Sequence, residues 1–198
     1  MSVYKVEQLE NKPEISEKEL AQLCARGDSS ARKELYNRYA TRLCALCSRY
    51  TNGAEEGIDL MHDTMIKAFQ KIRHYRYGGT GSLYAWLSRM AINMAIDRIR
   101  KQGKLSIIAL DENTPDVEEP TPEEIRSIPL PVLQRMIASL PDSKRLVFNM
   151  FCIDGLSHRE IAKQLGITEK TSSSTLSKAK KMLSTIIKNH TKRDGRMD

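Results

Sequence analysis

Residues 105–129, LSIIALDENTPDVEEPTPEEIRSIP, divide the chain into two halves of different character. The stretch has seven acidic residues and one basic residue, a net charge of −6, whereas residues 1–104 carry +6 and residues 130–198 carry +7. Its four prolines remove backbone donors and disfavour helix in the residues that precede them. We therefore predict an extended acidic linker between two small helical domains, with a solvated tether that has no further task as the alternative.

The length and the overall charge restrict the class of protein. A chain of 198 residues suits one mid-sized domain or two small ones, and the linker favours two. There is no apolar run of transmembrane length, and acidic residues interrupt the N-terminus before a secretory pattern forms, so a cytoplasmic location is expected. The net charge of +7 indicates a polyanionic partner, most commonly nucleic acid. A membrane surface is less favoured, because the basic residues lie on helices that are needed for packing.

The cysteines and histidines do not indicate a cofactor. Cys44 and Cys47 have the spacing of a metal-binding or redox pair, but no second pair or histidine cluster lies near them in the sequence. Both residues fall in an amphipathic helical pattern, which predicts small buried side chains. We therefore expect no metal and no cofactor.

Helix signals fill the first half of the chain. Ser16 and Glu19 predict a capping box at the start of a helix that Gly27 ends, and Asp28 or Ser29 can cap the next helix. In that second helix, three-to-four spacing predicts burial of Ala31, Leu35, Tyr39, Leu43, Leu46 and Tyr50. A third helix over residues 55–72 is predicted to bury Ile58, Met61 or Met65, Ala68, Phe69 and Ile72.

Two carboxylates project from the third helix. Asp59 and Asp63 are four residues apart and share one face. Such a pair can bind a divalent metal or act as an acid and a base, but no further carboxylate or histidine cluster completes the site. A solvated or partner-facing acidic surface is the favoured interpretation.

A glycine-containing loop leads into a fourth helix. Gly-Gly-Thr-Gly at residues 78–81 lacks the lysine and the spacing of a phosphate-binding P-loop, and Ser82 can cap the helix that follows. Rings supply stacking surfaces and cations hold the backbone of unpaired bases. Both kinds of side chain surround the loop, namely Arg73, His74, Tyr75, Arg76, Tyr77 and Tyr84. Trp86 is predicted to lie in the core, with contact to melted DNA as the alternative. The fourth helix also presents one polar face, formed by Asn93, Asp97, Arg100 and Lys101.

This region resembles the promoter-melting domain of the extracytoplasmic-function (ECF) sigma factors, the small two-domain members of the bacterial RNA polymerase sigma family. The resemblance spans about residues 16–104 and is carried by Asp59-Leu-Met-His-Asp-Thr-Met-Ile-Lys-Ala-Phe69, Trp86-Leu87, Ala91-Ile-Asn93 and Asp97-Arg-Ile-Arg-Lys101. It implies docking on the clamp helices of the polymerase β′ subunit by Asp59, Leu60, His62 and Asp63, with His62 where the family often has glutamine. It also implies capture of a flipped base of the −10 element and of the melted strand by the loop and the next helix, through Arg76, Tyr77, Tyr84, Asn93, Asp97, Arg100 and Lys101.

The second half carries the signals of a helix-turn-helix. Ser157 and Glu160 predict a capping box, Gly166 lies in the turn, and Thr168 caps a second helix. That helix is predicted to bury Leu176, Ala179, Leu183 and Ile187. Its opposite face has small polar and basic residues, which suit insertion into the major groove, namely Lys170, Ser173, Ser174, Ser177, Lys178 and Lys181. A plain helical hairpin is the alternative.

This segment resembles the second ECF sigma domain, which reads the −35 element, and we assign it residues 130–188. It departs from the family pattern at 172–175, where Ser-Ser-Ser-Thr stands in place of the valine, lysine, serine and arginine of many relatives. Phosphate contacts are therefore expected to come more from Lys178, Lys180 and Lys181. A basic tail follows over residues 189–198.

The two resemblances together predict an all-α, two-domain sigma factor with a flexible tail at residues 1–15 and no active site, cofactor or small-molecule substrate of its own. The implied partners are core polymerase, through β′ and the β flap, promoter DNA, and a membrane-bound anti-sigma factor that is usual in the family. The acidic linker would pass near the template strand and the RNA exit path of the polymerase.

Two other functions are compatible with parts of the sequence. A stand-alone, dimeric helix-turn-helix regulator would bind a palindromic duplex without polymerase. A metal-dependent nuclease built on Asp59, Asp63 and Asp97 would cleave DNA in magnesium.

Overall fold

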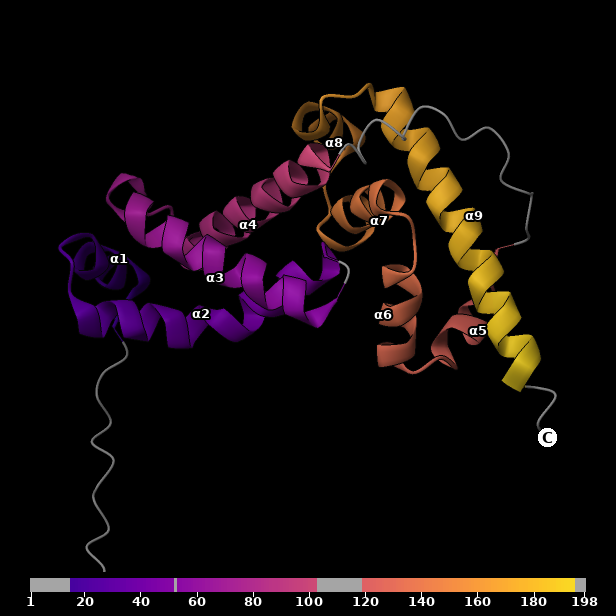
Figure 1. Cartoon of the computed structure of the whole chain (residues 1–198), viewed down its shortest axis with the longest axis horizontal. Helices are drawn as coiled ribbons and strands as arrows, with labels where there is room; N and C mark the ends of the chain where they lie inside the picture. Colours follow the sequence, from indigo (N-terminus) through magenta and orange to yellow (C-terminus); the bar gives the residue numbers. More distant parts are fainter. Residues whose placement is uncertain (1–14, 52, 103–118, 195–198) are drawn as a thin grey trace, which may run out of the picture.

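Helices make up the regular structure of the described chain, which confirms the predicted all-helical fold. The computed structural model describes residues 15–51, 53–102 and 119–194, the last three without their side chains. Most of the predicted acidic linker, including Asp111 and Asp116, lies outside these residues, as do most of the N-terminal tail and the chain's last four residues. The elements are α1 (Glu17–Ala25), α2 (Ser29–Arg49), α3 (Ala54–Lys71), η1 (Ile72–His74), α4 (Ser82–Lys101), α5 (Pro122–Arg126), α6 (Leu130–Ala138), α7 (Asp142–Phe148), the π-helical segment η3 (Asn149–Ile153), α8 (His158–Leu165) and α9 (Glu169–Asp194) (Figure 1).

The first two helices begin and end where local signals predict. The backbone N–H of Glu19 donates to Ser16 Oγ at 3.2 Å, the serine half of the predicted capping box, and that of Ala31 donates to Asp28 Oδ1 at 2.7 Å. Gly27 adopts φ +89° after α1, a conformation that favours glycine. All six residues of the predicted α2 stripe are buried, and they pack against α3 and α4.

The inward face of α3 differs from the predicted one. Ile58 is 41% exposed, so its predicted burial is wrong, whereas Leu60 is fully buried. The cause is the close approach of α2 at Gly57, where a Cβ atom would lie 2.9 Å from the Cα of Ser48. That approach turns the stripe of Gly57, Leu60, Met61, Thr64, Met65 and Ala68 inward. Ile58, one residue or about 100° from Gly57, faces solvent.

The sequence predicted Ser82 as the cap of α4, but the structure shows a cap from a residue of α1. Ser82 is the first residue of the helix, and its hydroxyl instead contacts the hydroxyl of Tyr75 at 2.5 Å. The carboxylate of Glu17 accepts from the backbone N–H of Gly81 at 2.9 Å and of Leu83 at 3.4 Å. This carboxylate therefore ties the glycine loop to α1.

Replacement of Glu17 by alanine is expected to lower the free energy of unfolding by about 2 kcal/mol. The change removes the α4 cap and leaves the buried Tyr39 hydroxyl, which donates to Glu17 at 2.8 Å, without its acceptor. Hydrogen exchange at the amides of Gly81 and Leu83 should accelerate at least about tenfold, the factor that corresponds to 1.4 kcal/mol. Glu19→Ala, an exposed position on the same helix, is the control, and equal exchange in both variants would contradict the assignment.

The second domain begins inside the predicted linker. Thr121 and Glu124 form a capping box, with Pro122 at the first helical position, so residues 122–126 are the helix α5 and not extended chain. Ile128 follows and is buried against α6 and α9 in a small core with Met136, Leu140, Ala179, Leu183 and Ile187. The sequence prediction missed this helix because prolines disfavour helix in the residues before them, whereas Pro122 stands at the first helical position, where proline is tolerated.

The predicted helix-turn-helix is present. Both halves of the Ser157–Glu160 capping box form, Gly166 ends α8 at φ +71°, and Thr168 Oγ1 accepts from the N–H of Thr171 at 3.0 Å. The four residues predicted to lie on the inner face of α9 are buried.

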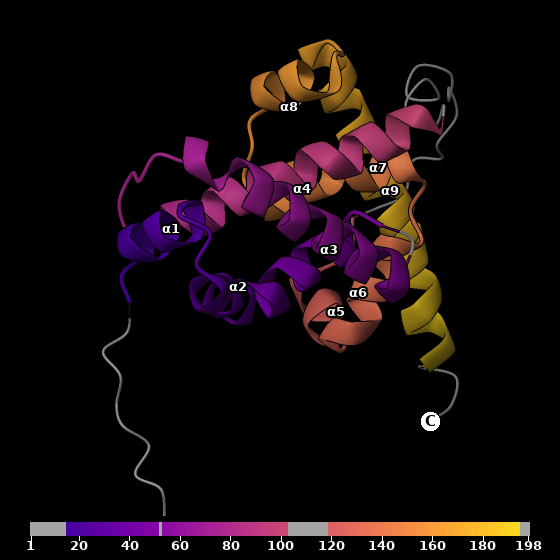
Figure 2. The same ribbon diagram turned by 60° about the vertical axis from the view of Figure 1, so that its left-hand side comes forward.

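The two domains touch each other. Leu146, Val147 and Met150 of the second domain belong to the same hydrophobic cluster as the core of the first domain. Figures 1 and 2 both show α7 beside the α2–α4 bundle, with α9 on the far side of α7. The guanidinium of Arg49 forms an ion pair with Asp154 across this junction at 3.0 Å.

Candidate nucleic-acid and partner interfaces

A basic and aromatic cavity lies beside the glycine loop. Its volume is about 300 Å³, and it is lined by His74, Tyr75, Arg76, Ser82, Ala85, Trp86 and Arg89. The rings of Tyr75 and Trp86 are 5.4 Å apart and tilted by 54°. Burial raises the pKa of Tyr75, which keeps the phenol protonated beside Ser82. Two rings and two guanidinium groups at one cavity can stack on a base and hold its phosphate.

The structure places the predicted −10 residues in three groups, which are two residues of the loop, one tyrosine under Arg42, and four residues on the outer face of α4. Arg76 lines the cavity, and Tyr77 stands outside it with 44% exposure. Tyr84 points elsewhere, beneath the guanidinium of Arg42, whose carbon lies 3.8 Å from the ring centroid. The third group, Asn93, Asp97, Arg100 and Lys101, forms the predicted exposed polar face of α4.

Sequence reasoning missed Arg89 and placed Trp86 only in part. Trp86 packs against the core, as predicted, but it also lines the cavity. Arg89 follows Trp86 by three residues and Ser82 by seven, which puts all three on one face of α4. The i, i+4, i+7 spacing of Ser82, Trp86 and Arg89 could have predicted this shared face from the sequence.

The face of α3 that was predicted to dock on polymerase is only partly exposed. Asp59 is exposed, and Asp63 forms an ion pair with Arg98 of α4 at 2.5 Å. The predicted docking residue Leu60 is fully buried, so its side chain cannot form part of this surface.

Three residues one turn apart define the exposed ridge of α3. Ile58 is 41% and Ile66 is 57% exposed, and His62 lies between them. His62 Nε2 lies 3.2 Å from the hydroxyl of Tyr36, a half-exposed ring of α2 that stacks on the imidazole. The i, i+4, i+8 spacing of Ile58, His62 and Ile66 was readable from the sequence, but the predicted stripe took Ile58 inward.

Within the described part of the chain, no group of three histidine, cysteine, aspartate or glutamate side chains could hold a metal ion. Cys24 and Cys47 are buried, and burial raises their pKa to about 11 and about 12. Cys44 is only partly buried and Cys152 is exposed.

On the outer face of α9, four of the six predicted −35 residues are exposed to solvent. Lys170, Ser173, Ser174 and Ser177 are exposed, whereas Lys178 and Lys181 are partly buried. Ser172 is fully buried, and its hydroxyl lies 3.0 Å from Nδ1 of His158, which fixes α9 against α8. Thr175 is buried as well, so half of the 172–175 run is unavailable to DNA.

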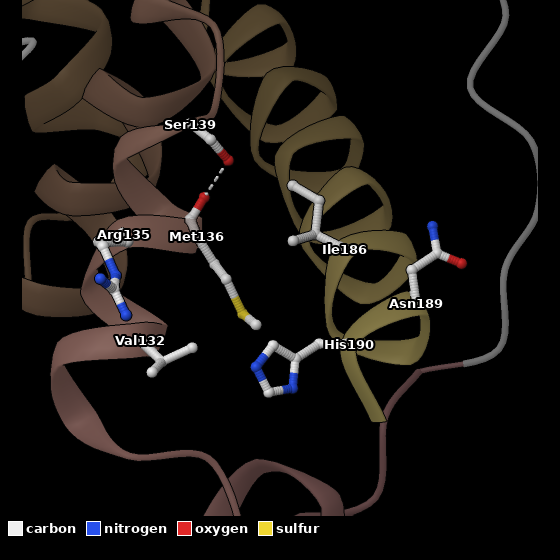
Figure 3. Close-up of a pocket in the computed structure, with 7 residues that line it drawn as sticks. All are labelled: Val132, Arg135, Met136, Ser139, Ile186, Asn189 and His190. Carbon is white, nitrogen blue, oxygen red and sulfur yellow. Dashed lines mark hydrogen bonds between the residues drawn. The ribbon is translucent and has the colours of Figure 1, made fainter. Parts of the chain in front are cut away.

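A groove of about 480 Å³ separates α6 from the C-terminal half of α9 (Figure 3). The side chains of Val132, Met136 and Ile186 give it an apolar wall, and His190 lies at one end. The hydroxyl of Ser139 donates to the carbonyl of Met136 at 2.7 Å and so does not interrupt this wall. The groove suits an apolar segment of a partner.

Comparison with protein families gives two matches in separate parts of the chain. Sigma-70 region 2 matches residues 35–105, and Sigma-70, region 4 matches residues 131–183. The first match contains the glycine loop and the α3 ridge, and the second contains the helix-turn-helix.

Two relatives extend the similarity over most of the chain. The ECF RNA polymerase sigma factor SigE of Mycolicibacterium smegmatis is 30% identical over 173 residues, which cover 84% of this chain and 66% of that protein. The ECF RNA polymerase sigma-E factor of Haemophilus influenzae is 26% identical over 181 residues, covering 86% and 94%.

A solved structure shares the fold. The sigma factor RpoE of Bartonella quintana, crystallised with the anti-sigma factor NepR, superimposes with a TM-score of 0.51 at 20% identity, covering 79% of this chain and 96% of that one.

Among the described helices of this chain, none is long and apolar enough to cross a membrane.

Proposed function

Because the chain belongs to the ECF family of RNA polymerase sigma factors, we propose that it binds core RNA polymerase, directs it to specific promoters and assists their melting. One observation carries the proposal: a cavity suited to an unpaired base and a helix-turn-helix suited to duplex DNA occur in one chain, in the family's order. Neither a lone helix-turn-helix regulator nor a nuclease accounts for both.

The first domain, residues 16–104, would act on the −10 element. The cavity beside the glycine loop takes one flipped base against the rings of Tyr75 and Trp86, and Arg76 and Arg89 hold the adjoining phosphates. The exposed face of Asn93, Asp97, Arg100 and Lys101 follows the melted strand, and the exposed ring of Tyr77 lies outside the cavity. These contacts require unpaired DNA, so binding favours the open duplex over the closed one and supplies free energy for melting.

The second domain, from α5 to residue 188, would read the −35 element. Ser173, Ser174 and Ser177 are small enough to let α9 approach the base edges. Lys170, Lys178 and Lys181 contact phosphates and fix the register of the helix.

Replacement of Lys170 by alanine is expected to weaken promoter binding by the holoenzyme about equally for all sequences. One fewer phosphate contact should reduce the slope of log affinity against log salt by about 1. Filter binding over a salt series measures it, with Lys33→Ala, an exposed position on α2, as the control. An unchanged slope would remove Lys170 from the interface.

Two surfaces are proposed for core polymerase. The α3 ridge of Ile58, His62 and Ile66, flanked by Asp59 and Asp63, docks on the β′ clamp helices. The groove between α6 and α9 receives the β flap, because its wall is apolar and the chain's own helices leave it open (Figure 3).

Further partners and the location follow from the same proposal. The Bartonella relative was crystallised with an anti-sigma factor, and we propose a partner of that class for this chain in the bacterial cytoplasm, held at the inner membrane when the partner is membrane-bound. Sigma factors are transcription initiation factors and not enzymes in themselves, and we propose no catalytic role for Asp59, Asp63 or Asp97. The acidic linker is proposed to run through basic polymerase channels.

Run-off transcription tests the proposal. The full chain, added to core polymerase with genomic fragments, should create start sites that core polymerase alone does not use. The free chain should bind duplex promoter DNA far more weakly than the holoenzyme does. Absence of new start sites under conditions where a control sigma factor is active would refute the proposal, and tight palindromic binding without polymerase would favour the regulator.

A further inference from the structure

One carboxylate of α1 holds the beginning of α4. The Oε2 atom of Glu17 accepts from the backbone N–H of Gly81 at 2.9 Å and of Leu83 at 3.4 Å. The N–H of Ser82, which lies between them, donates to the carbonyl of Gly79 at 3.1 Å. A negative charge is favoured at a helix N-terminus, and a charged acceptor forms stronger hydrogen bonds than a neutral one. Glu17 therefore fixes the backbone of the first turn of α4.

The carboxylate is itself held in place by α2. The hydroxyl of Tyr39 donates to Oε1 of Glu17 at 2.8 Å, so the two carboxylate oxygens have separate partners. Tyr39 is buried, and burial raises its pKa, so the hydroxyl keeps the proton that it donates. Rotation of Glu17 away from α4 would leave this buried hydroxyl without an acceptor, which is unfavourable. The packing of α1 on α2 thus sets the direction of the carboxylate.

The anchored turn orients one ring of the cavity beside the glycine loop. Ser82 Oγ accepts from the N–H of Gly78 at 3.2 Å and lies 2.5 Å from the hydroxyl of Tyr75. Tyr75 lines the cavity together with Trp86. Burial raises the pKa of Tyr75, and the negative charge of Glu17 adds to this rise because the carboxylate lies near the phenol. A chain of contacts therefore leads from Glu17 through Ser82 to the ring of Tyr75.

The glycine loop needs such an anchor. Gly79 and Gly81 adopt φ +110° and +84°, and most residues of the loop are exposed. A segment of this kind samples many conformations unless its ends are held. Here α1 packs against η1 just before the loop, and its carboxylate binds the residues that end the loop. Because apparent affinity scales with the fraction of molecules in the binding-competent state, holding both ends should strengthen binding of a base.

We propose that Glu17 is a positioning residue for promoter melting, which presets the cavity of Tyr75 and Trp86 for a flipped base of the −10 element before DNA arrives. The proposal rests on the sigma-factor function proposed above. Both carboxylate oxygens are occupied by donors of the protein, so Glu17 acts through the first turn of α4 and not by contact with DNA.

The test compares the holoenzymes of the wild type and of Glu17→Ala on a promoter found by run-off transcription. Fluorescence anisotropy measures binding to a fragment whose −10 element is left unpaired, and to fragments in which one −10 base at a time is replaced by an abasic sugar. In the wild type, loss of the flipped base should weaken binding about tenfold, since a stacked base contributes that much.

Glu17→Ala should lose most of this dependence on the base. If the cavity is preset in about a tenth of the variant molecules, the abasic change should cost only about twofold, and the intact fragment should bind about fivefold more weakly than it binds the wild type. A loss of folded protein alone would weaken binding of both fragments equally and leave the tenfold ratio unchanged.

Three further variants sharpen the test. Glu17→Gln keeps an oxygen for the two N–H groups, and the hydroxyl of Tyr39 can accept from its amide, so a ratio of at least about sixfold is expected. Glu19→Ala, an exposed position on the same helix, should keep the wild-type ratio. Tyr39→Phe removes one hydroxyl and loosens the carboxylate, so its ratio should fall to about fourfold. This variant decides the matter if Glu17→Ala does not form a holoenzyme.

A tenfold ratio in both Glu17→Ala and Tyr39→Phe overturns the proposal. Tighter binding of the intact fragment by Glu17→Ala also overturns it, because the carboxylate would then compete with DNA phosphates for the N-terminus of α4. The absence of an abasic effect at every −10 position in the wild type would remove the cavity from the interface, and with it the role of Glu17.

Run-off transcription separates this proposal from the function on which it rests. New start sites with the wild type, together with an unchanged ratio in the variants, contradict the positioning role alone. Absence of transcription with the wild type contradicts the sigma-factor function.

Discussion

Replacement of Ile66 by arginine is expected to reduce the affinity for core polymerase at least about 100-fold, with little effect on folding. Ile66 is 57% exposed, more than Ile58, and lies one turn from His62 on the α3 ridge. In a protein interface, a central apolar side chain can contribute 2 to 4 kcal/mol, and a buried unpaired guanidinium adds a desolvation cost. The expected loss therefore amounts to about 3 kcal/mol or more.

The measurement is fluorescence anisotropy of the labelled full chain titrated with core polymerase. Gln22→Arg adds the same charge at an exposed position on α1 and should bind like the wild type. The melting temperature should be the same for both variants, because both positions are exposed. Wild-type affinity of Ile66→Arg would show that the α3 ridge does not dock on polymerase.

Replacement of Gly57 by alanine is expected to destabilise the first domain by about 2 kcal/mol. The new Cβ atom would lie 2.9 Å from Cα and 3.0 Å from N of Ser48, and these backbone atoms move only if α2 and α3 separate. Overpacking of this kind costs about 3 kcal/mol, and the better helix propensity of alanine returns about 1 kcal/mol. The net loss should lower the Tm of this domain by about 8 to 16 °C.

Calorimetry of the full chain measures the effect, with Gly53→Ala as the control. At Gly53 a Cβ atom meets nothing within 4 Å, and the backbone is extended, so a change within about 0.5 kcal/mol is expected. Equal stability of the two variants would mean that the helices relax apart at no cost.

Much of the local structure could be predicted because its causes are local. Asp28, Ser157 and Thr168 each accept a hydrogen bond from an N–H three residues on, and Gly166 ends its helix through its own φ angle. These interactions depend on side chains within one turn of helix. The buried stripes of α2 and α9 were predictable for the same reason, since periodicity fixes which side chains share a face.

The predictions failed where two distant segments meet. The sequence cannot show that Glu17 caps α4, because the residues involved are 64 and 66 positions apart. It could not decide between Ile58 and Leu60, because each of them adjoins Met61 on the helix surface, although the two lie about 200° apart. The approach of Ser48 to Gly57 selects the inward side.

The sequence by itself determined an all-helical chain, the helix-turn-helix, and the basic and aromatic character of the glycine loop. The tertiary structure alone decided which of these side chains line one cavity, which carboxylate caps α4, and that Asp154 meets Arg49 across 105 positions. The physical reason is that caps and stripes form within one or two turns of helix, whereas a cavity or an ion pair between domains exists only after packing has brought separate helices together.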